Sequence, residues 1–182
     1  PFPDYDISHQ YILDMGRIVP IKCVPWHITF EDFIILGARG CPHQCNYCCN
    51  QKVKREFPWR KEVQHYSVDY LIRHLREAMK LFPDIRNFWI GDDTIFDKKM
   101  DEIEEFSSRY KKEVGKPFTI NISPWTFSEE KIRLMIDAGM NRLIMGIQTG
   151  SENVAKNVYN RNITNEKVRR IAVALNKLSD QM

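Results

Sequence analysis

Three closely spaced cysteines give this 182-residue sequence its clearest chemical potential. Cys41, Cys45 and Cys48 follow one another at spacings of four and three residues. Cysteine thiolates hold the irons of iron–sulfur clusters, and three of them can occupy three corners of a four-iron cube. The fourth iron then stays open for a ligand from outside the chain. The spacing therefore predicts a 4Fe–4S cluster with an open coordination position.

Two other uses of the cysteines compete with this interpretation. A structural zinc site needs a fourth ligand, which His43 or Cys49 could supply, although zinc ribbons usually combine two separated cysteine pairs. A disulfide is a weaker interpretation because the chain has five cysteines, an odd number, and Cys48 and Cys49 are adjacent. Cys49 breaks the spacing, so we expect it to lie outside the cluster. Cys23 stands alone and is expected to be a buried apolar side chain.

The cysteine segment follows a short apolar run. Residues 33–36 (Phe-Ile-Ile-Leu) form that run, and the turn residues 37–40 (Gly-Ala-Arg-Gly) separate it from Cys41. A continuous apolar run bounded by turn residues is typical of a strand that is buried on both faces of a parallel sheet. In parallel α/β folds the chemistry lies at the carboxyl ends of the strands. We therefore expect the cysteines at that end of a sheet.

The segment 41–48 (Cys-Pro-His-Gln-Cys-Asn-Tyr-Cys) resembles the CxxxCxxC signature of the radical SAM superfamily, in which an aromatic residue precedes the last cysteine. The resemblance implies a 4Fe–4S cluster on Cys41, Cys45 and Cys48, with Tyr47 beside the cofactor. It also implies that the open iron binds S-adenosylmethionine (SAM) and that the enzyme cleaves SAM reductively to a 5′-deoxyadenosyl radical. The resemblance extends from about residue 33 to the C-terminus.

The first of three later segments with this resemblance is Gly91-Asp92-Asp93, which follows the expected strand 85–90. The family has a glycine-rich acidic motif here that binds the amino group of SAM, so Gly91, Asp92 and Asp93 are expected to contact the cofactor. Glycine lets the backbone approach a ligand closely, and carboxylates suit an ammonium group. A helix cap or a turn would also explain these residues.

The second segment is the expected strand 118–122, which runs into Ser123. Asn121 and Ser123 point to the same side of a regular strand. The position resembles the ribose-contacting strand of the family, which implies that either side chain hydrogen-bonds a ribose hydroxyl of SAM. Asn121 would equally suit a core amide whose hydrogen bonds are satisfied within the protein.

The third segment begins at Gln148, after the expected strand 143–147. Residues 148–151 (Gln-Thr-Gly-Ser) resemble a Glu-Ser-Gly-Ser stretch of cobalamin-type members, which implies that Gln148 contacts SAM. Arg161 lies where the family has a lysine or arginine that reaches the SAM carboxylate. A rigid guanidinium fork suits a carboxylate, although a surface arginine is the ordinary interpretation of the sequence alone.

Amphipathic segments alternate with the apolar runs and predict helices over 67–81, 98–114, 128–138, 151–159 and 165–178. The sequence therefore predicts an α/β fold, a partial (β/α) barrel of the radical SAM type with about four strand–helix units. The barrel of the family has six, so we expect this chain to be truncated, with its C-terminal strands missing. The expected division is a linker and N-terminal extension over 1–30 and a radical SAM core over 31–182.

The prolines near the start favour extended backbone in the linker. This stretch resembles the connection that follows the cobalamin-binding domain in cobalamin-dependent radical SAM proteins. The resemblance implies a possible role as a cobalamin-dependent methyltransferase, with the cobalamin domain upstream, because about 30 residues are too few to form one.

Composition restricts the other functions. The net charge of +3 is small and points neither to nucleic acid nor to a membrane. The basic segment 51–65 leaves an RNA-modifying radical SAM enzyme as an alternative, but we expect a solvated loop there. A non-catalytic structural zinc module is the other alternative. The expected partners are a small-molecule substrate and an electron donor such as flavodoxin or ferredoxin. The odd cysteine count and the lack of an evident leader predict a cytoplasmic protein.

Overall fold

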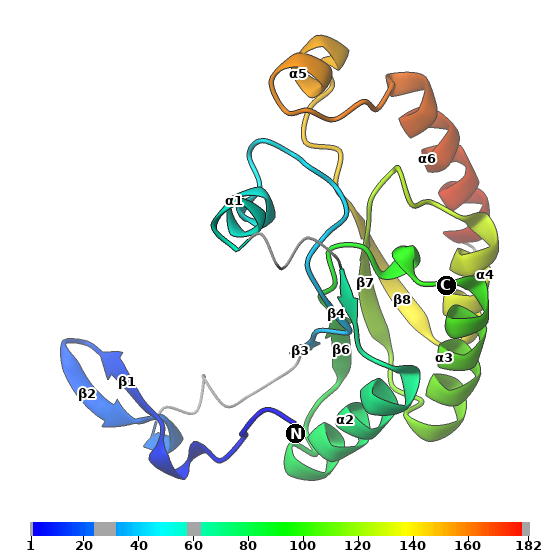
Figure 1. Cartoon of the computed structure of the whole chain (residues 1–182). Coiled ribbons are helices and arrows are strands. Elements are labelled where there is room, and N and C mark those ends of the chain that lie inside the picture. Colours follow the sequence, from blue (N-terminus) through cyan, green and yellow to red (C-terminus); the bar gives the residue numbers. More distant parts are fainter. Residues whose placement is uncertain (1, 24–31, 58–62, 180–182) are drawn as a thin grey trace.

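Four parallel strands form the central sheet of the computed structural model, which describes residues 2–23, 32–57 and 63–179. The strands are β3 (Asp32–Ile35), β6 (Asn87–Ile90), β7 (Phe118–Ile122) and β8 (Met140–Met145), and they lie in that order across the sheet. Helices alternate with them along the chain (Figure 1). This arrangement confirms the predicted α/β fold and matches part of a (β/α) barrel.

Helices α2 (Val68–Leu81), α3 (Met100–Glu113), α4 (Glu129–Asp137) and α6 (Asn165–Ser179) lie together on one side of the sheet (Figure 1). Two of them begin at the expected serine caps. The Ser67 hydroxyl accepts a hydrogen bond from the backbone N–H of Tyr70, and the Ser128 hydroxyl accepts one from Lys131. Each cap satisfies a backbone donor that has no partner within the helix.

The core lies between this helical layer and one face of the sheet. Side chains that alternate along the strands, such as Phe33, Ile35 and Phe88, are almost fully buried against the helices. Ile34 and Leu36, which point the other way, are 59% and 48% exposed. The prediction of a strand buried on both faces is therefore wrong for residues 33–36, because no helix covers the second face in the described part of the chain.

A polar network crosses the open face at the start of the strands. Arg142 in β8 donates to the Thr119 hydroxyl of β7 at 2.9 Å and forms an ion pair with Asp32 of β3 at 2.9 Å. Asn87 in β6 donates to Asp32 at 2.6 Å and to Thr119 at 3.2 Å. Because Arg142 reaches Asp32 across two intervening strands, the sheet must be strongly curved. The hydrogen bond from Arg142 is the main cause of the lowered pKa of Asp32.

Several elements escaped the sequence patterns. The N-terminal part contains the hairpin β1 (Tyr11–Asp14) and β2 (Arg17–Pro20), whose turn at Met15-Gly16 has positive φ at both residues, as such hairpins require. Short helical turns form at η1 (Ile7–His9) and η2 (Ile21–Cys23). Cys23 is exposed at the end of η2, away from the core, so its expected burial is wrong.

The connections around the cysteines are also more regular than expected. The short strands β4 (Ala38–Arg39) and β5 (Gln64–His65) pair antiparallel. Helix α1 (Cys49–Glu56) occupies the start of the basic segment that was expected to be a loop, and residues 58–62 of that segment lie outside the described residues. The other elements are η5 (Ile95–Asp97) and α5 (Glu152–Asn157). No helix in the described ranges is long and apolar enough to span a membrane.

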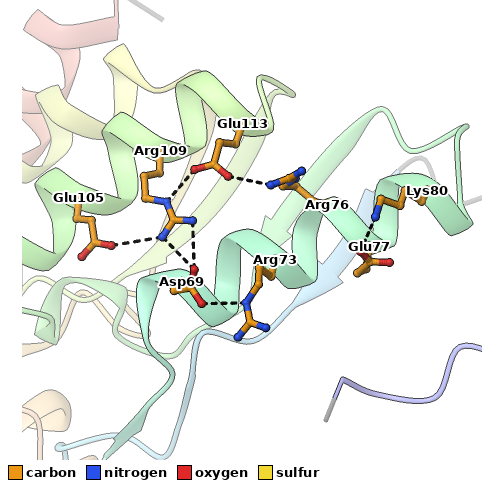
Figure 2. A network of polar contacts seen from close by, with 8 residues as sticks. All are labelled: Asp69, Arg73, Arg76, Glu77, Lys80, Glu105, Arg109 and Glu113. Atoms are coloured by element: carbon orange, nitrogen blue, oxygen red, sulfur yellow. Dashed lines mark hydrogen bonds and ion pairs between the residues drawn. The ribbon is translucent and has the colours of Figure 1, made fainter.

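Charged side chains join the outer surfaces of α2 and α3 (Figure 2). Arg109 donates to Glu113 at 2.8 Å and also pairs with Asp69 of α2 at 3.4 Å. Arg76 completes the network with an ion pair to Glu113 at 3.2 Å. Exposed ion pairs contribute little singly, but linked pairs that share one arginine constrain how the two helices align.

Tyr110 offers a test of the packing on the inner side of α3. Its side chain is 0% exposed, and its hydroxyl has no hydrogen-bond partner among the described residues. We expect Tyr110→Phe to raise the free energy of unfolding by about 1 kcal/mol in urea denaturation, because the variant removes a buried hydroxyl and keeps the ring. The matched variant Tyr110→Leu loses the ring contact with Phe118 (centroids 4.5 Å apart) and should be less stable than wild type. Equal losses in both variants would contradict this account.

Candidate functional site

The three motif cysteines lie on one connection at the carboxyl end of the parallel sheet, between β4 and α1 (Figure 1). Cys45 is buried, whereas Cys41 and Cys48 are half-buried. The backbone N–H of Cys48 donates to the Cys45 carbonyl at 3.1 Å, which forms a turn, and Cys48 is the N-cap residue of α1. The structure thus brings the cysteines to the end of the sheet at which parallel folds carry their chemistry.

The thiols influence one another electrostatically. Burial raises the pKa of Cys41, and the nearby Asp93, Cys45 and Cys48 act in the same direction, while the backbone N–H of His43 acts against them. Such effects require proximity because charge interactions fall with distance. Three neighbouring thiols, none in a disulfide, form a donor set that suits an iron–sulfur cluster.

A single zinc ion and an iron–sulfur cluster make different demands on the cysteines. Structural zinc is held by four ligands around a single ion, and the described residues contain no group of three or more His, Cys, Asp or Glu side chains that could hold one ion. In a cluster each thiolate binds its own iron, so convergence on one point is not required. Of the two extra ligands considered for zinc, Cys49 is exposed and His43 packs its ring on Trp125, with centroids 4.2 Å apart.

Asp92 supports the chain before the cysteines. It is 1% exposed, and its Oδ1 accepts backbone hydrogen bonds from Gly37 and Ala38, the latter at 3.0 Å. A Cβ on Gly37 would lie 2.8 Å from Asp92 Oδ2 and 2.9 Å from Leu71, so this close approach requires glycine. Asp92 therefore has a structural role here, and its expected contact with SAM stays a prediction.

The two neighbours of Asp92 have different surroundings. Asp93 is exposed, and its Oδ2 accepts a 2.7 Å hydrogen bond from Asn50 of α1. At Gly91 a Cβ would lie 3.2 Å from Ile34 and 3.4 Å from Leu36. A side chain at position 91 would therefore press on Ile34 and Leu36, which would have to shift by a few tenths of an ångström to admit it.

Asn121 and Ser123 already have partners within the protein. Asn121 accepts a hydrogen bond from the indole N–H of Trp89 at 3.2 Å. Ser123 is buried, and its hydroxyl accepts from the backbone N–H of Trp125 at 3.3 Å. These contacts occupy the Asn121 oxygen and the Ser123 hydroxyl, and both the core-amide role of Asn121 and the ribose contact of either residue stay predictions.

Gln148 lies in the connection after β8. It is exposed and has φ of 74°, an uncommon conformation for a residue other than glycine. A Cβ on Gly146 would lie 3.0 Å from its side-chain nitrogen. Backbone strain of this kind concentrates at ligand sites. The positive φ of Gln148 is therefore a structural indication of a ligand site, in addition to the sequence motif.

Arg161 joins three parts of the site. It is 6% exposed, and it donates to the Tyr47 hydroxyl at 2.6 Å and to the Gly146 carbonyl at 2.8 Å. Its guanidinium also lies over the Trp125 ring, 4.8 Å from the centroid. The structure therefore places Arg161 as a buried centre between the cysteine segment and the ends of β7 and β8, where the sequence alone favoured a surface position.

Sequence reasoning missed Trp125, Asn46 and Asn160 at this site. Trp125 lies between His43 and Arg161. Asn46 and Asn160 hydrogen-bond across the site to backbone carbonyls. A weak signal for Asn160 existed, since asparagine favours positive φ and its φ is 53°. The pairing of segments more than 100 residues apart has no signature in a single sequence.

Comparisons with known proteins give a common result. The model of the radical SAM superfamily matches residues 35–180. The chain is 27% identical over 173 residues to cytidylyl-2-hydroxyethylphosphonate methyltransferase of Streptomyces wedmorensis, covering 92% of this chain and 30% of that protein. It is 24% identical over 129 residues to the heme chaperone HemW of Bacillus subtilis (strain 168), covering 65% of this chain and 32% of that protein.

Solved structures show the same fold. The radical S-adenosylmethionine methyltransferase TsrM from Kitasatospora setae, with cobalamin and a [4Fe–4S] cluster bound, matches with a TM-score of 0.64 and 13% identity, over 81% of this chain and 29% of that one. The same enzyme with tryptophan and a SAM analogue matches with a TM-score of 0.66 and 12% identity, over 94% of this chain and 33% of that one. The chain thus spans about a third of the length of these proteins.

The titration of Asp92 gives a test of its structural role. Burial raises the pKa of Asp92 from 3.8 to about 6, although the hydrogen bonds from Gly37 and Ala38 act against this. The folded protein therefore binds a proton that the unfolded chain releases, so the stability of wild type should fall as the pH rises from about 4 to about 6. We expect Asp92→Asn to remove this loss, which amounts to about 3 kcal/mol at most.

Urea denaturation of both proteins between pH 4 and pH 7 measures this effect. Asp32→Asn is the contrasting variant. The pKa of Asp32 is lowered, so this carboxylate stabilises the fold above its unfolded pKa and loses that contribution as the pH falls. A difference between wild type and Asp92→Asn that does not change with pH would rule out the buried titration.

Proposed function

This chain belongs to the radical SAM superfamily, and we propose that it holds a 4Fe–4S cluster and SAM at the carboxyl end of its curved sheet and cleaves SAM reductively. The observation that carries the proposal is the grouping of three neighbouring thiols on one connection at that end of the sheet. A chain of this family with such a donor set has the protein ligands for three irons of a cluster.

Cys41, Cys45 and Cys48 are the proposed cluster ligands. Cys48 is the N-cap residue of α1, so one proposed ligand is held at the start of a helix. The burial of Cys45 limits the access of solvent to one corner of the site. When bound, the cluster and SAM supply a 5′-deoxyadenosyl radical, which abstracts hydrogen from a substrate.

The remaining residues of the site would orient SAM. Asp93 carries an exposed carboxylate close to Cys41, which suits an ammonium group. Gln148 offers an exposed amide after β8. Arg161 has five N–H donors, and two of them bond to other residues in the part of the chain that the structure describes. Asn121 faces the open side of the sheet, where a ribose hydroxyl could add to its bond from Trp89. Gly91, Asp92 and Ser123 shape the site through their contacts within the protein, and their expected contacts with SAM stay predictions.

The reaction on the substrate is inferred from relatives. Two of them are methyltransferases by name, and one was solved with cobalamin bound. We therefore propose methyl transfer to a small molecule, with cobalamin as a second cofactor of the whole protein. The electron for SAM cleavage would come from a flavodoxin or a ferredoxin. Because this chain covers about a third of these relatives, these statements concern the protein as a whole.

Reconstitution without oxygen tests the cluster. We expect about four irons and four sulfides per chain, and an electron paramagnetic resonance (EPR) spectrum of the reduced protein that changes when SAM is added. Cys45→Ser should lower the iron content sharply. Its matched control is Cys49→Ser, an exposed cysteine beside the motif, which should keep the wild-type iron content. Bound zinc without an EPR signal in wild type would refute the proposal.

The SAM contact of Asp93 has its own test. We expect Asp93→Ala to keep the cluster and to weaken SAM binding about tenfold or more in an EPR-monitored titration, because a charged hydrogen bond is lost. Asn50→Ala removes the protein partner of Asp93 and leaves the carboxylate, so it should retain SAM affinity. Asp137→Ala, on the exposed surface of α4, is a control for loss of a surface carboxylate together with its ion-pair partner, Lys111. Equal SAM affinity in Asp93→Ala and wild type would remove Asp93 from the site.

A further inference from the structure

The turn that follows α5 makes an unusual set of contacts with the cysteine segment. The backbone N–H of Asn46 donates to the Tyr159 carbonyl at 3.1 Å, and the Asn46 amide donates to the Val158 carbonyl at 2.9 Å. In the opposite direction, the Asn160 amide donates to the Gln44 carbonyl at 2.9 Å. These bonds join segments that are more than 110 residues apart in the sequence.

Two aromatic side chains extend this contact. The Tyr47 ring packs edge-on against the Tyr159 ring, with centroids 4.9 Å apart. The Tyr47 hydroxyl accepts the 2.6 Å hydrogen bond from Arg161. Asn46 and Tyr47 are the only residues between Cys45 and Cys48. Both residues that lie between these two cysteines, Asn46 and Tyr47, therefore contact residues 158–161.

The turn itself is well anchored. The backbone N–H groups of Tyr159 and Arg161 donate to Val154 and Ala155 at 3.0 and 2.7 Å, which fixes the turn on the end of α5. The positive φ of Asn160 gives it the sharp bend needed to face the cysteine segment. The buried guanidinium of Arg161 then ties the turn to Gly146 and Trp125 at the ends of β8 and β7.

We propose that residues 158–161 are a positioning device for the cysteine segment, which transmits the geometry of the β7 and β8 ends to Cys45 and Cys48. Asn46, Asn160 and Arg161 are its positioning residues, and they act through the backbone and Tyr47 rather than on the cluster. For Arg161 this role is additional to any contact with SAM. The contacts themselves are between residues of this chain and do not depend on a cluster. Only the statement that the cysteine segment binds a cluster rests on the proposed function.

Thiol reactivity in the cluster-free chain tests the device directly. Cys45 is 7% exposed, so its alkylation requires local opening of the segment, whereas Cys49 is exposed and serves as an internal reference. Asn46→Ala removes the bond to Val158, and Asn160→Gly removes the bond to Gln44 while tolerating the positive φ. We expect alkylation of Cys45, measured by mass spectrometry relative to Cys49, to accelerate about fivefold for each lost bond.

Asn157→Ala is the matched control, because this asparagine lies on α5 and its amide bonds to Asn153 within the same helix. In this variant Cys45 should be alkylated at the wild-type rate. Unchanged Cys45 reactivity in the double variant Asn46→Ala, Asn160→Gly would overturn the proposal. Acceleration in Asn157→Ala equal to that in the other variants would also overturn it, since general loosening of the fold would then explain the result.

The reconstituted protein gives a second, spectroscopic measurement. Tyr47→Phe keeps the ring and removes the hydroxyl that Arg161 holds, so we expect the iron content of wild type and an altered EPR spectrum of the reduced cluster. Identical EPR spectra of Tyr47→Phe and wild type would show that the bond between Tyr47 and Arg161 does not help to position the cysteine segment. If wild type assembles no cluster, the proposed function fails, while the alkylation rates still decide whether the turn positions the cysteine segment.

Discussion

The buried carboxylate of Asp92 is the interaction on which the site depends. It accepts backbone hydrogen bonds from Gly37 and Ala38 and so joins the end of β6 to the point where the chain leaves β3. A buried carboxylate is unfavourable, as its raised pKa shows. It persists because the two N–H groups would otherwise be buried without partners at the start of the cysteine connection. Glycine at position 37 follows from the same contact, since any larger residue would collide with Asp92 and Leu71.

From this starting point the cysteine connection is held at successive places by two later segments of the chain, residues 92–93 after β6 and residues 158–161 after α5. Asp92 fixes its beginning, the turn at 158–161 holds its middle, and the hydrogen bond between Asn50 and Asp93 fixes the helix that follows it. Two of the supports come from the segment just after β6, and the third comes from the turn after α5. The segment has few apolar anchors of its own, and α1 contains no buried residue among those described. Its geometry is therefore set by polar contacts from distant parts of the sequence, which is how a rigid scaffold can position a loop that carries chemistry.

The elements of the core could be predicted because their patterns are local. Helix α2 begins after Ser67 as expected, and β7 covers the expected residues 118–122, since caps and apolar periodicity depend on near neighbours only. Exposure was harder to predict. An apolar run at 33–36 cannot show that one of its faces lacks a covering layer. The burial of Arg161 could not be predicted from the sequence either. It depends on partners from distant parts of the chain, such as Tyr47 and Gly146. The cysteine spacing was readable because cluster chemistry itself fixes that spacing.

The two ends of the sheet differ in a way that confines chemistry to one of them. At the amino ends of the strands, Asp32, Asn87, Thr119 and Arg142 satisfy one another across the open face. The polar side chains at the amino ends of the strands therefore bond to one another, and these bonds stabilise the curvature of the sheet. At the carboxyl ends, Gly91 and Gly146 lack side chains, and Asp93 and Gln148 extend exposed polar groups. Because curvature is maintained at one end, the other end can keep glycines and strained backbone without losing the shape of the sheet, and the cysteine segment can be supported there by hydrogen bonds and ring contacts.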